Sequence, residues 1–365
     1  MALDVAFLGY GFMGKAHANA LARLPMFFPD APATNRDVLI GRNEEAATEA
    51  AERLGFDRVA TDWRDVVEDV DVFYNLGPNQ IHAEPTITAL ESDVHVMCEK
   101  PLAPDLGTAR EMRDVARESD AIAGTAFNYR FVPAVQLAKR LVDEGELGEI
   151  YRFKGRYLQD WLADADAPWN WRCDADIAGF GVVGDVGSHT LDLARWIVGD
   201  VARVSGSLST HVSERPDPDG EGTRPVTTDD EYSALIEFEN GADGVVEGSR
   251  VATGRKADNS IEIYGSKGAL EFSLRRLNEL RFKGADDREY EELLVTEPED
   301  PYMDAWWPAG HIIGWEHAIV HEHYEFLRAI DGDSRYRPDF DDGFAVERVV
   351  EAVQESDERG EWVEP

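Results

Sequence analysis

The segment FLGYGFMGKAH places three glycines between a short apolar run and a helical pattern. Gly9, Gly11 and Gly14 stand in G-x-G-x-x-G spacing, with Phe12 and Met13 between the last two. In a strand–turn–helix unit, such glycines allow a tight turn, close approach of the backbone to a pyrophosphate, and close helix packing. A glycine-rich turn without a ligand is the alternative. The position between a strand and a helix favours a dinucleotide-binding loop.

Apolar runs typical of buried strands alternate with helical stretches through the first third of the chain. The runs are DVAFLG, DVLIG, VDVFYNL, DVHVMC and AIAGTAF, and the segments between them carry good helix formers at helical spacing. This alternation predicts a parallel sheet covered by helices on both faces. We therefore expect a doubly wound α/β domain of the Rossmann type over residues 1–125.

The rest of the chain, residues 126–365, has a different pattern. Strand-like segments such as EYSALIEFENGADGVVEGSRV and SIEIYGSKGALEF are joined by short turns, which predicts an α+β domain with a large, mostly antiparallel open sheet. The acidic stretch 213–230 is rich in proline and glycine, and we expect a mobile loop there. Four valines within residues 346–353 share one helical face, so this C-terminal helix should pack back onto the body.

The composition is strongly acidic, with 73 Asp and Glu against 36 Lys and Arg and a net charge of −37. This charge repels nucleic acid and anionic membranes, so neither is expected as a partner. Scattered acids with little lysine resemble the proteins of salt-accumulating microbes, in which cations screen the repulsion, so we expect a halophilic protein. An acidic protein of a mesophile is the alternative. No leader segment and no membrane-spanning apolar run is recognised, and a cytoplasmic location is expected. Cys98 and Cys173 provide no disulfide framework.

The end of the second predicted strand, LIGRNEE, bears on the choice between NAD and NADP. A carboxylate at this strand end holds the ribose 2′-hydroxyl of NAD, whereas a nearby arginine accommodates the 2′-phosphate of NADP. Gly41 occupies that position here and is followed by Arg42 and Asn43. The alternative is a surface arginine paired with Glu44 or Glu45. We expect NADP or NAD as the cofactor, with a modest preference for NADP.

One of the few lysines follows a buried strand in the segment VHVMCEKPLAP. Because ligands of open α/β sheets bind at the carboxyl ends of the strands, Glu99 and Lys100 should face the cofactor. Pro101 disfavours a helical conformation at Lys100. An ammonium beside a reacting hydroxyl stabilises developing alkoxide charge. The alternative is a lysine that only forms a salt bridge with Glu99.

The segment GDVGSHTLDLARW carries a second set of candidate residues. If the helix extends back through the glycines, one face holds Asp185, His189, Asp192 and Trp196. Histidine titrates near neutral pH, and an adjacent carboxylate orients it and stabilises its protonated form. Asp185 and His189 therefore suit abstraction of a proton from an alcohol. A purely structural histidine is the alternative.

The segments GYGFMGKAHANAL, PNQIHAEPTITAL, CEKPLA, NYRFVPAVQLAKRLVDEGELGEI and GDVGSHTLDLARWIVGD occur in this order. With them the chain resembles the glucose–fructose oxidoreductase/inositol dehydrogenase (Gfo/Idh/MocA) family over essentially its full length. The resemblance implies reversible hydride transfer between nicotinamide and a carbon of a sugar or cyclitol. It also implies that His189 is the base, that Lys100 polarises the hydroxyl and that Asp185 completes the catalytic set.

The same resemblance places the Pro78–Asn79 pair, His82 and Asn128 near the cofactor. Gly77 is a departure, because the family usually has threonine at this position, and the glycine removes the hydroxyl on which one expected cofactor contact depends. The resemblance also implies assembly into a homodimer or homotetramer through the open sheet of the second domain.

The segment RYLQDWLADADAPWNWRCD is the candidate substrate-binding region. Aromatic faces stack on sugar rings while carboxylates and amides bind hydroxyls, and the segment resembles a family branch acting on neutral sugars, anhydrosugars or inositols. An aromatic core cluster is the alternative for each tryptophan. The expected substrate-binding residues are Lys100, Asp160, Trp161, Arg172, Asp185 and His189, with Gln159 and Trp171 beside them.

His317 and His321 have metal-ligand spacing, but Ala318 stands where an H-E-x-x-H site has glutamate, so no metal is expected. His311, before this helix, is a candidate for the substrate pocket. The expected function is an NAD(P)-dependent dehydrogenase of a sugar, anhydrosugar or cyclitol. A non-catalytic, cofactor-binding sensor of the same fold and an NAD-dependent glycosidase that begins with the same hydride step are the alternatives.

Overall fold

The computed structural model describes residues 2–332 and 335–365 and divides the chain into two compact units. The first unit comprises Met1–Phe131 and Gly314–Phe344, and the second comprises Val132–Ile313 and Ala345–Pro365. This division differs from the contiguous boundary expected after residue 125, because a late segment of the chain returns to the first unit. A helix in that segment looks like any other amphipathic helix, so the sequence carries no signal of its return.

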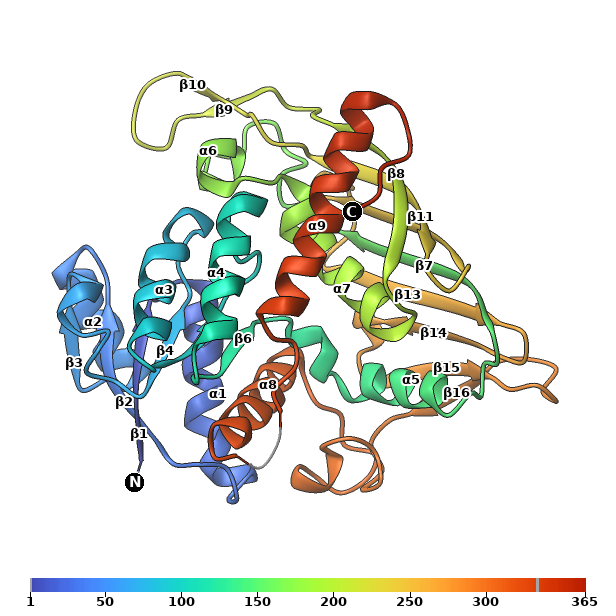
Figure 1. Cartoon of the computed structure of the whole chain (residues 1–365), viewed down its shortest axis with the longest axis horizontal. Coiled ribbons are helices and arrows are strands. Elements are labelled where there is room, and N and C mark those ends of the chain that lie inside the picture. Colours follow the sequence, from blue (N-terminus) through green and yellow to red (C-terminus); the bar gives the residue numbers. More distant parts are fainter. Residues whose placement is uncertain (1, 333–334) are drawn as a thin grey trace. The chain divides into compact units, whose positions relative to one another are not determined.

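The first unit is a parallel sheet flanked by helices (Figure 1). Its strands have the order β3-β2-β1-β4-β5-β6, and the paired strands run parallel. The doubly wound α/β fold is therefore confirmed. In chain order its elements are β1 (Leu3–Leu8), α1 (Phe12–Phe27), β2 (Thr34–Ile40), α2 (Glu44–Leu54), β3 (Arg58–Ala60), β4 (Val72–Asn75), α3 (Ala83–Glu91), β5 (His95–Cys98), α4 (Leu106–Glu118), β6 (Ala123–Thr125) and α8 (Trp315–Ile330).

The core of this unit follows from the apolar runs of the strands. Side chains of the central strands, among them Val38, Phe73 and Val96, are fully buried and belong to one hydrophobic cluster with residues of α4. Strands buried on both faces are expected in a sheet that helices cover on both sides. The carboxyl ends of β1, β4 and β5 are thereby held in fixed register at one edge.

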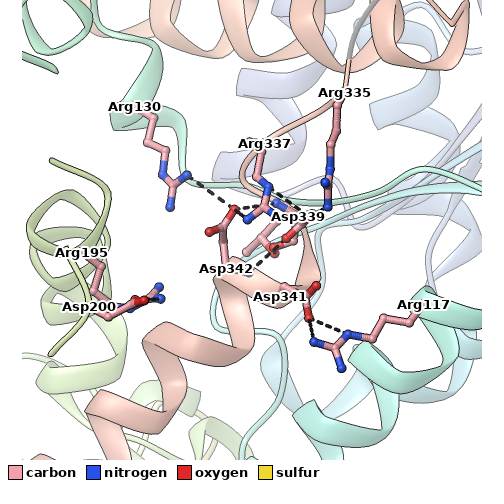
Figure 2. A network of polar contacts seen from close by, with 10 residues as sticks. Arg117, Arg130, Arg195, Asp200, Arg335, Arg337, Asp339, Asp341 and Asp342 are labelled. Carbon is pink, nitrogen blue, oxygen red and sulfur yellow. Dashed lines mark hydrogen bonds and ion pairs between the residues drawn. The ribbon is translucent and has the colours of Figure 1, made fainter. Parts of the chain in front are cut away.

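Arginine–aspartate contacts tie the segment around the start of the C-terminal helix to other parts of the first unit (Figure 2). Asp342 lies 3.0 Å from Arg337 and 3.6 Å from Arg130, which is almost fully buried. Arg117 of α4 contacts Asp341 at 2.7 Å. The backbone N–H of Thr125 in β6 also donates to the Pro338 carbonyl. Backbone pairing and ion pairs together hold this returning segment at the edge of the sheet.

The second unit is built on a sheet with the strand order β16-β15-β14-β13-β7-β12-β11-β8 (Figure 1). The β7–β12 pair is parallel, whereas the other pairs of this sheet are antiparallel, which confirms the expected α+β domain. Its elements are α5 (Pro133–Asp143), β7 (Ile150–Leu158), α6 (Ala175–Ala178), α7 (Ser188–Ile197), β8 (Val201–Ser209), β9 (Glu214–Pro216), β10 (Thr223–Pro225), β11 (Glu231–Phe238), β12 (Asp243–Ser249), β13 (Asp258–Gly265), β14 (Ala269–Ser273), β15 (Glu279–Lys283) and β16 (Glu291–Leu294).

The stretch 213–230 was expected to be a mobile loop, and the structure corrects this expectation. It contains the antiparallel pair β9–β10, with Thr223 opposite Pro216. The Arg215 side chain is fully buried and donates to the carbonyl of Leu162 at 2.7 Å and to that of Asp164 at 2.8 Å. Composition predicted the turn at the tip, but it gave no sign that an arginine would anchor the hairpin.

Helix α9 (Phe340–Arg359) begins in the first unit and continues into the second. Within the second unit, its four valines between residues 346 and 353 are almost fully buried, as expected. The Gly206 N–H of β8 donates to Ser356 Oγ at 2.9 Å, and a Cβ at Gly206 would lie 2.7 Å from Val353. The glycine therefore lets α9 lie close against β8.

Candidate cofactor-binding and active site

The glycine loop between β1 and α1 has the geometry that its sequence predicts. Gly9 has φ of +111°, and a Cβ there would lie 2.8 Å from the Leu76 carbonyl oxygen. A Cβ at Gly14 would lie 2.7 Å from the Gly9 carbonyl oxygen, whereas a Cβ at Gly11 would meet nothing within 4 Å. Gly9 and Gly14 are thus required by the turn itself. Gly11 faces open space, where the backbone is accessible to a ligand.

The N-terminus of α1 suits a bound phosphate. Gly11 is its N-cap, no side chain caps it, and its first turn carries no acidic residue within the described chain. Its first N–H groups and the positive end of the helix dipole therefore remain for an anion. Phe12, 71% exposed, stacks on Trp315 of α8 with ring centroids 5.4 Å apart, while Met13 lies on the next helical position.

A second observation supports the fit of a dinucleotide. Asn128, in the short helical turn after β6, is buried, and its Nδ2 has no hydrogen-bond partner among residues 2–332 and 335–365. A buried amide donor without a partner is costly and generally marks a missing acceptor. Asn128 follows a strand of the nicotinamide half of the sheet, where ligands of this fold bind. The residues present therefore fit a dinucleotide, and Asn128 would donate to it.

The end of β2 explains why residue 41 is glycine. A Cβ at Gly41 would lie 2.2 Å from Cε1 of Tyr10, so the tyrosine ring occupies the space of a side chain there. Asn43 caps α2, with Oδ1 accepting from the Ala46 N–H at 3.0 Å. Arg42 is exposed and makes no hydrogen bond or ion pair with any residue that the structure describes. The pairing with Glu44 or Glu45, considered above, is therefore not formed.

His82 braces the loops that follow β4 and β5. It is fully buried, its Nδ1 lies 2.9 Å from the Pro101 carbonyl oxygen, and its Nε2 lies 3.0 Å from that of Gly77. Burial lowers the pKa of His82, and the two carbonyls oppose this effect. Since both ring nitrogens face backbone oxygens, His82 supports the loops that carry Pro78–Asn79 and Lys100. At Gly77, a Cβ would lie 2.4 Å from the side chain of Ile81, which fills the space of the family's threonine.

Glu99 and Lys100 directly follow β5, as expected. Glu99 is buried, and its Oε2 accepts from the backbone N–H of Lys100 at 3.3 Å. The peptide bond between Lys100 and Pro101 is cis. The hydrogen bond from the Lys100 N–H links the Glu99 carboxylate to the backbone of the lysine that follows it.

In the second unit, Asp185 lies in a π-helical turn (Val183–Gly187) that leads directly into α7. The helix thus extends back through the glycines, but its pitch changes, and π turns of this kind are frequent at functional sites. His189 lies in the first turn of α7, 9% exposed, with its ring centroid 6.0 Å from that of Tyr157. Lys100 belongs to the first unit, so its joining with these residues into one site is part of the proposal below.

Two arginines surround Asp185. Arg172 Nε lies 3.6 Å from Asp185 Oδ2, and Arg250 Nη1 lies 3.9 Å from the same oxygen. Arg250 is 1% exposed and also donates to the Asp229 carbonyl oxygen at 2.6 Å. Burial raises the pKa of Asp229, while Arg250 opposes the shift. We had not predicted Arg250, although a charged residue at the end of the apolar strand β12 was a usable signal.

The segment 159–174 contains both accessible and structural residues. Trp161 is 42% exposed, and the Arg172 guanidinium lies over the ring of Trp171 at 4.2 Å. Asp160 is engaged by its own unit: Lys256 Nζ lies 2.6 Å from Oδ1, and the Gly254 N–H donates to Oδ2. Lys256 accordingly lowers the pKa of Asp160. Trp169 packs with Cys173 and Val226, as the core-cluster alternative predicts.

The histidines near α8 have other partners. His321 is fully buried and donates from Nδ1 to the Phe131 carbonyl oxygen, and burial lowers its pKa to about 3. Burial and Arg23 lower the pKa of His317 to about 4. His311 is exposed, with Nδ1 2.7 Å from the Pro308 carbonyl oxygen. No group of His, Cys, Asp or Glu that could hold a metal is found among the described residues.

A glycine loop suited to a phosphate, an unpartnered buried amide, and a second unit with an acid on a π turn and a histidine in the helix that follows it are the features of a dinucleotide-dependent oxidoreductase. Residues 3–127 match the oxidoreductase family with an NAD-binding Rossmann fold, and residues 135–271 match the GFO/IDH/MocA C-terminal domain. The chain belongs to the Gfo/Idh/MocA family of oxidoreductases.

Two relatives and one solved structure are similar to this chain over most of its length. Over 381 residues the chain is 40% identical to levoglucosan dehydrogenase of Pseudarthrobacter phenanthrenivorans, covering 99% of this chain and 98% of that protein. A structure of levoglucosan dehydrogenase with NADH and levoglucosan has a TM-score of 0.96 at 40% identity, covering 100% of this chain and 99% of the other. Myo-inositol 2-dehydrogenase of Thermotoga maritima is 28% identical over 271 residues, covering 73% of this chain and 74% of that protein. The chain is an oxidoreductase with an NAD-binding Rossmann fold.

Proposed function

We propose that this protein oxidises a secondary hydroxyl of a neutral anhydrosugar of the levoglucosan type. One observation carries the proposal: the chain keeps Lys100 after β5 and the Asp185–His189 pair at the π turn, in a chain 40% identical over its length to a levoglucosan dehydrogenase. A sensor that only binds the cofactor has no need of a proton-transfer set. Retention of these three residues therefore favours the enzyme over the sensor.

The chain's own residues handle the proton and the charge. His189 takes the hydroxyl proton of the substrate, and Asp185 orients the imidazole and stabilises its protonated form. Lys100 donates to the same oxygen and stabilises the developing alkoxide. A bound nicotinamide would supply the acceptor for the hydride of the carbon, so the alcohol would become a ketone while its hydroxyl proton goes to His189. Arg172 and Arg250 both lie beside Asp185 Oδ2 and hold this carboxylate in place.

The remaining expected residues are assigned by their contacts. Gly11, the α1 N-terminus, Asn79 and Asn128 bind the dinucleotide, and His82 supports them. Trp161 contacts the substrate because its ring is exposed. Arg172 contacts the substrate because it lies beside Asp185. Asp160 holds residues 254–256 in place and acts on the substrate only indirectly, through this segment.

The decisive experiment is a substrate panel with purified protein in concentrated KCl. Levoglucosan, free hexoses, inositols and aryl glycosides are each offered with NAD and NADP, while formation of reduced nicotinamide is followed by absorbance. We expect the highest kcat/KM with levoglucosan or another anhydrosugar and a ketone as the product. A released aglycone would establish the glycosidase instead, and cofactor binding without turnover of any substrate would establish the sensor.

Cellular location and assembly are also part of the proposal. No helix among the described residues is long and apolar enough to cross a membrane. The acidic composition supports a cytoplasmic protein of a cell with high internal salt. Leu235, 51% exposed on the outer face of β11, supports a homodimer or homotetramer through the open sheet. Light scattering after size exclusion, in low and high KCl, measures the assembly.

A further inference from the structure

A hydrogen-bonded chain of four polar side chains crosses the interior of the first unit. His17 Nε2 lies 3.1 Å from Glu99 Oε1, and His17 Nδ1 lies 2.7 Å from His323 Nε2. The hydroxyl of Tyr74 completes the chain at 3.1 Å from His323 Nδ1. His17 lies in α1, His323 in α8 and Tyr74 in β4, while Glu99 directly follows β5, and none of the four is more than 6% exposed. We call them the buried histidine chain.

The chemistry of the four groups sets the direction of the hydrogen bonds. Burial holds the pKa of His323 well below its ordinary value, so His323 is neutral and carries one N–H. Burial and nearby Glu322 raise the pKa of Tyr74, so its hydroxyl keeps its proton. An ionised carboxylate only accepts. For the tautomer in which His17 carries its proton on Nε2, His17 donates to Glu99, His323 donates to His17, and Tyr74 donates to His323.

This direction matters for Glu99. A buried carboxylate is costly unless donors compensate it, and donors in series polarise one another in a dry interior. The histidine chain supplies such a donor to Oε1, while Oε2 faces the N–H of Lys100 at 3.3 Å. Fixing one oxygen fixes the plane of the carboxylate and thereby the direction of its remaining lone pairs at the carboxyl end of β5.

We propose that His17, His323 and Tyr74 are positioning residues that hold the Glu99 carboxylate toward the nicotinamide half of the bound dinucleotide. The proposal rests on the role given above to Glu99 and Lys100 at the cofactor. His17 acts on the cofactor only through Glu99, His323 acts through His17, and Tyr74 acts through His323. Their effects should therefore diminish along the chain.

The test is a fluorescence titration of NADH and NADPH with variants of the full-length protein. His17→Leu removes the donor to Glu99, and we expect the Kd to rise roughly tenfold or more, as for loss of a bond to a charged group. His17→Gln keeps an amide N–H near the position of Nε2, and its Kd should stay within about threefold of wild type. Tyr74→Phe removes one hydroxyl at the far end, and its Kd should rise roughly two- to threefold.

The matched control is His321→Asn. His321 lies in α8, as His323 does, and is equally buried. Its Nδ1 donates to the Phe131 carbonyl oxygen and not to a member of the histidine chain. Asparagine keeps this donor but fills less of the buried space than histidine does. The variant should therefore have a lower melting temperature and an unchanged Kd. If His321→Asn weakened cofactor binding as much as His17→Leu, the effect would be general destabilisation and the proposal would be overturned. If His17→Leu did not fold, an unchanged Kd in Tyr74→Phe would overturn it equally.

Glu99→Gln separates this proposal from the proposed function. We expect Glu99→Gln to weaken binding, and His17→Leu to add little further loss in the double variant, because both changes remove the same contact. Weak binding in Glu99→Gln with normal binding in His17→Leu would overturn the histidine chain and leave the proposed function intact. Normal binding and turnover in both variants would overturn the histidine chain together with the role of Glu99. If no substrate were turned over but these Kd effects appeared, the proposed function would fail and the histidine chain would stand.

Discussion

Arg42→Ala should lower the efficiency of the enzyme with NADP and leave its efficiency with NAD nearly unchanged. Arg42 is exposed and has no hydrogen bond or ion pair within the described chain, so its guanidinium is available to a 2′-phosphate. A phosphate monoester carries roughly 1.5 to 2 negative charges at neutral pH. At about 4 Å in water, this charge contributes roughly 1.5 kcal/mol of attraction, or about tenfold in kcat/KM. Bidentate hydrogen bonds would raise the factor toward a hundred.

Gly41 and Tyr10 determine whether substitutions can change the preference from NADP to NAD. A carboxylate at position 41 would favour the 2′-hydroxyl of NAD, but its Cβ would lie 2.2 Å from the Tyr10 ring. Gly41→Asp alone should therefore impair both cofactors, because the ring and the glycine loop must shift. Tyr10→Ala combined with Gly41→Asp should restore activity with NAD and reject NADP.

The assay compares kcat/KM for NADP and NAD at one fixed salt concentration, because salt screens the phosphate contact. We expect wild type to prefer NADP by about one to two powers of ten on the energies above. Arg53→Ala, near the end of α2, the helix that follows Arg42, is the control with an equal change of charge at an exposed residue. If wild type prefers NAD, or if Arg42→Ala and Arg53→Ala change the cofactor ratio equally, Arg42 is only a surface residue.

Four further outcomes are expected. Lys100→Met should cut kcat/KM on the order of 100-fold or more with nearly unchanged cofactor Kd, and activity within a few-fold of wild type would remove Lys100 from the mechanism. His189→Asn should abolish the acidic limb of the pH–rate profile for oxidation, and an unaltered limb would argue against His189 as the base. The depressed pKa of His321, about 3 against 6.5, means that the unfolded state binds the proton first as pH falls, so stability is lost between pH 6.5 and 3. At pH 5 the loss is about 2 kcal/mol, and urea denaturation of His321→Asn should show a flatter pH dependence in this range. Finally, the melting temperature should rise from dilute buffer to concentrated KCl because the 73 acids repel one another, and a flat profile would contradict a halophilic protein.

The sequence predicted those features whose signals are local and periodic. The strands that became β1, β2, β4 and β5 are apolar runs between helical patterns, and the glycine loop has a fixed spacing, so both were recognisable. Strand β3 spans three residues, Arg58–Ala60, which is too short to show a period. Strands β15 and β16 carry charged residues at many positions and read as surface loop.

Features that depend on distant parts of the chain were not predictable. His17 and His323 are 306 positions apart, and each looks like an ordinary helical histidine until the fold joins them. The carboxyl end of β5 could be predicted, which is why Glu99 and Lys100 were identified, but the donors that hold Glu99 could not. Arg250 lies between these cases, because its place after an apolar strand was visible although its contact with Asp185 was not.

The late return of α8 to the first unit has a consequence for the order of folding. Helix α1 packs on α8, and the bond from His17 to His323 closes a loop of about 300 residues. During synthesis, the first 131 residues leave the ribosome long before α8 is made. Until then, β4 and α1 expose polar groups such as His17 and Tyr74, which are buried in the folded protein. Such long-range closure slows folding. The nucleotide-binding unit therefore becomes complete only after the whole of the intervening unit has been made.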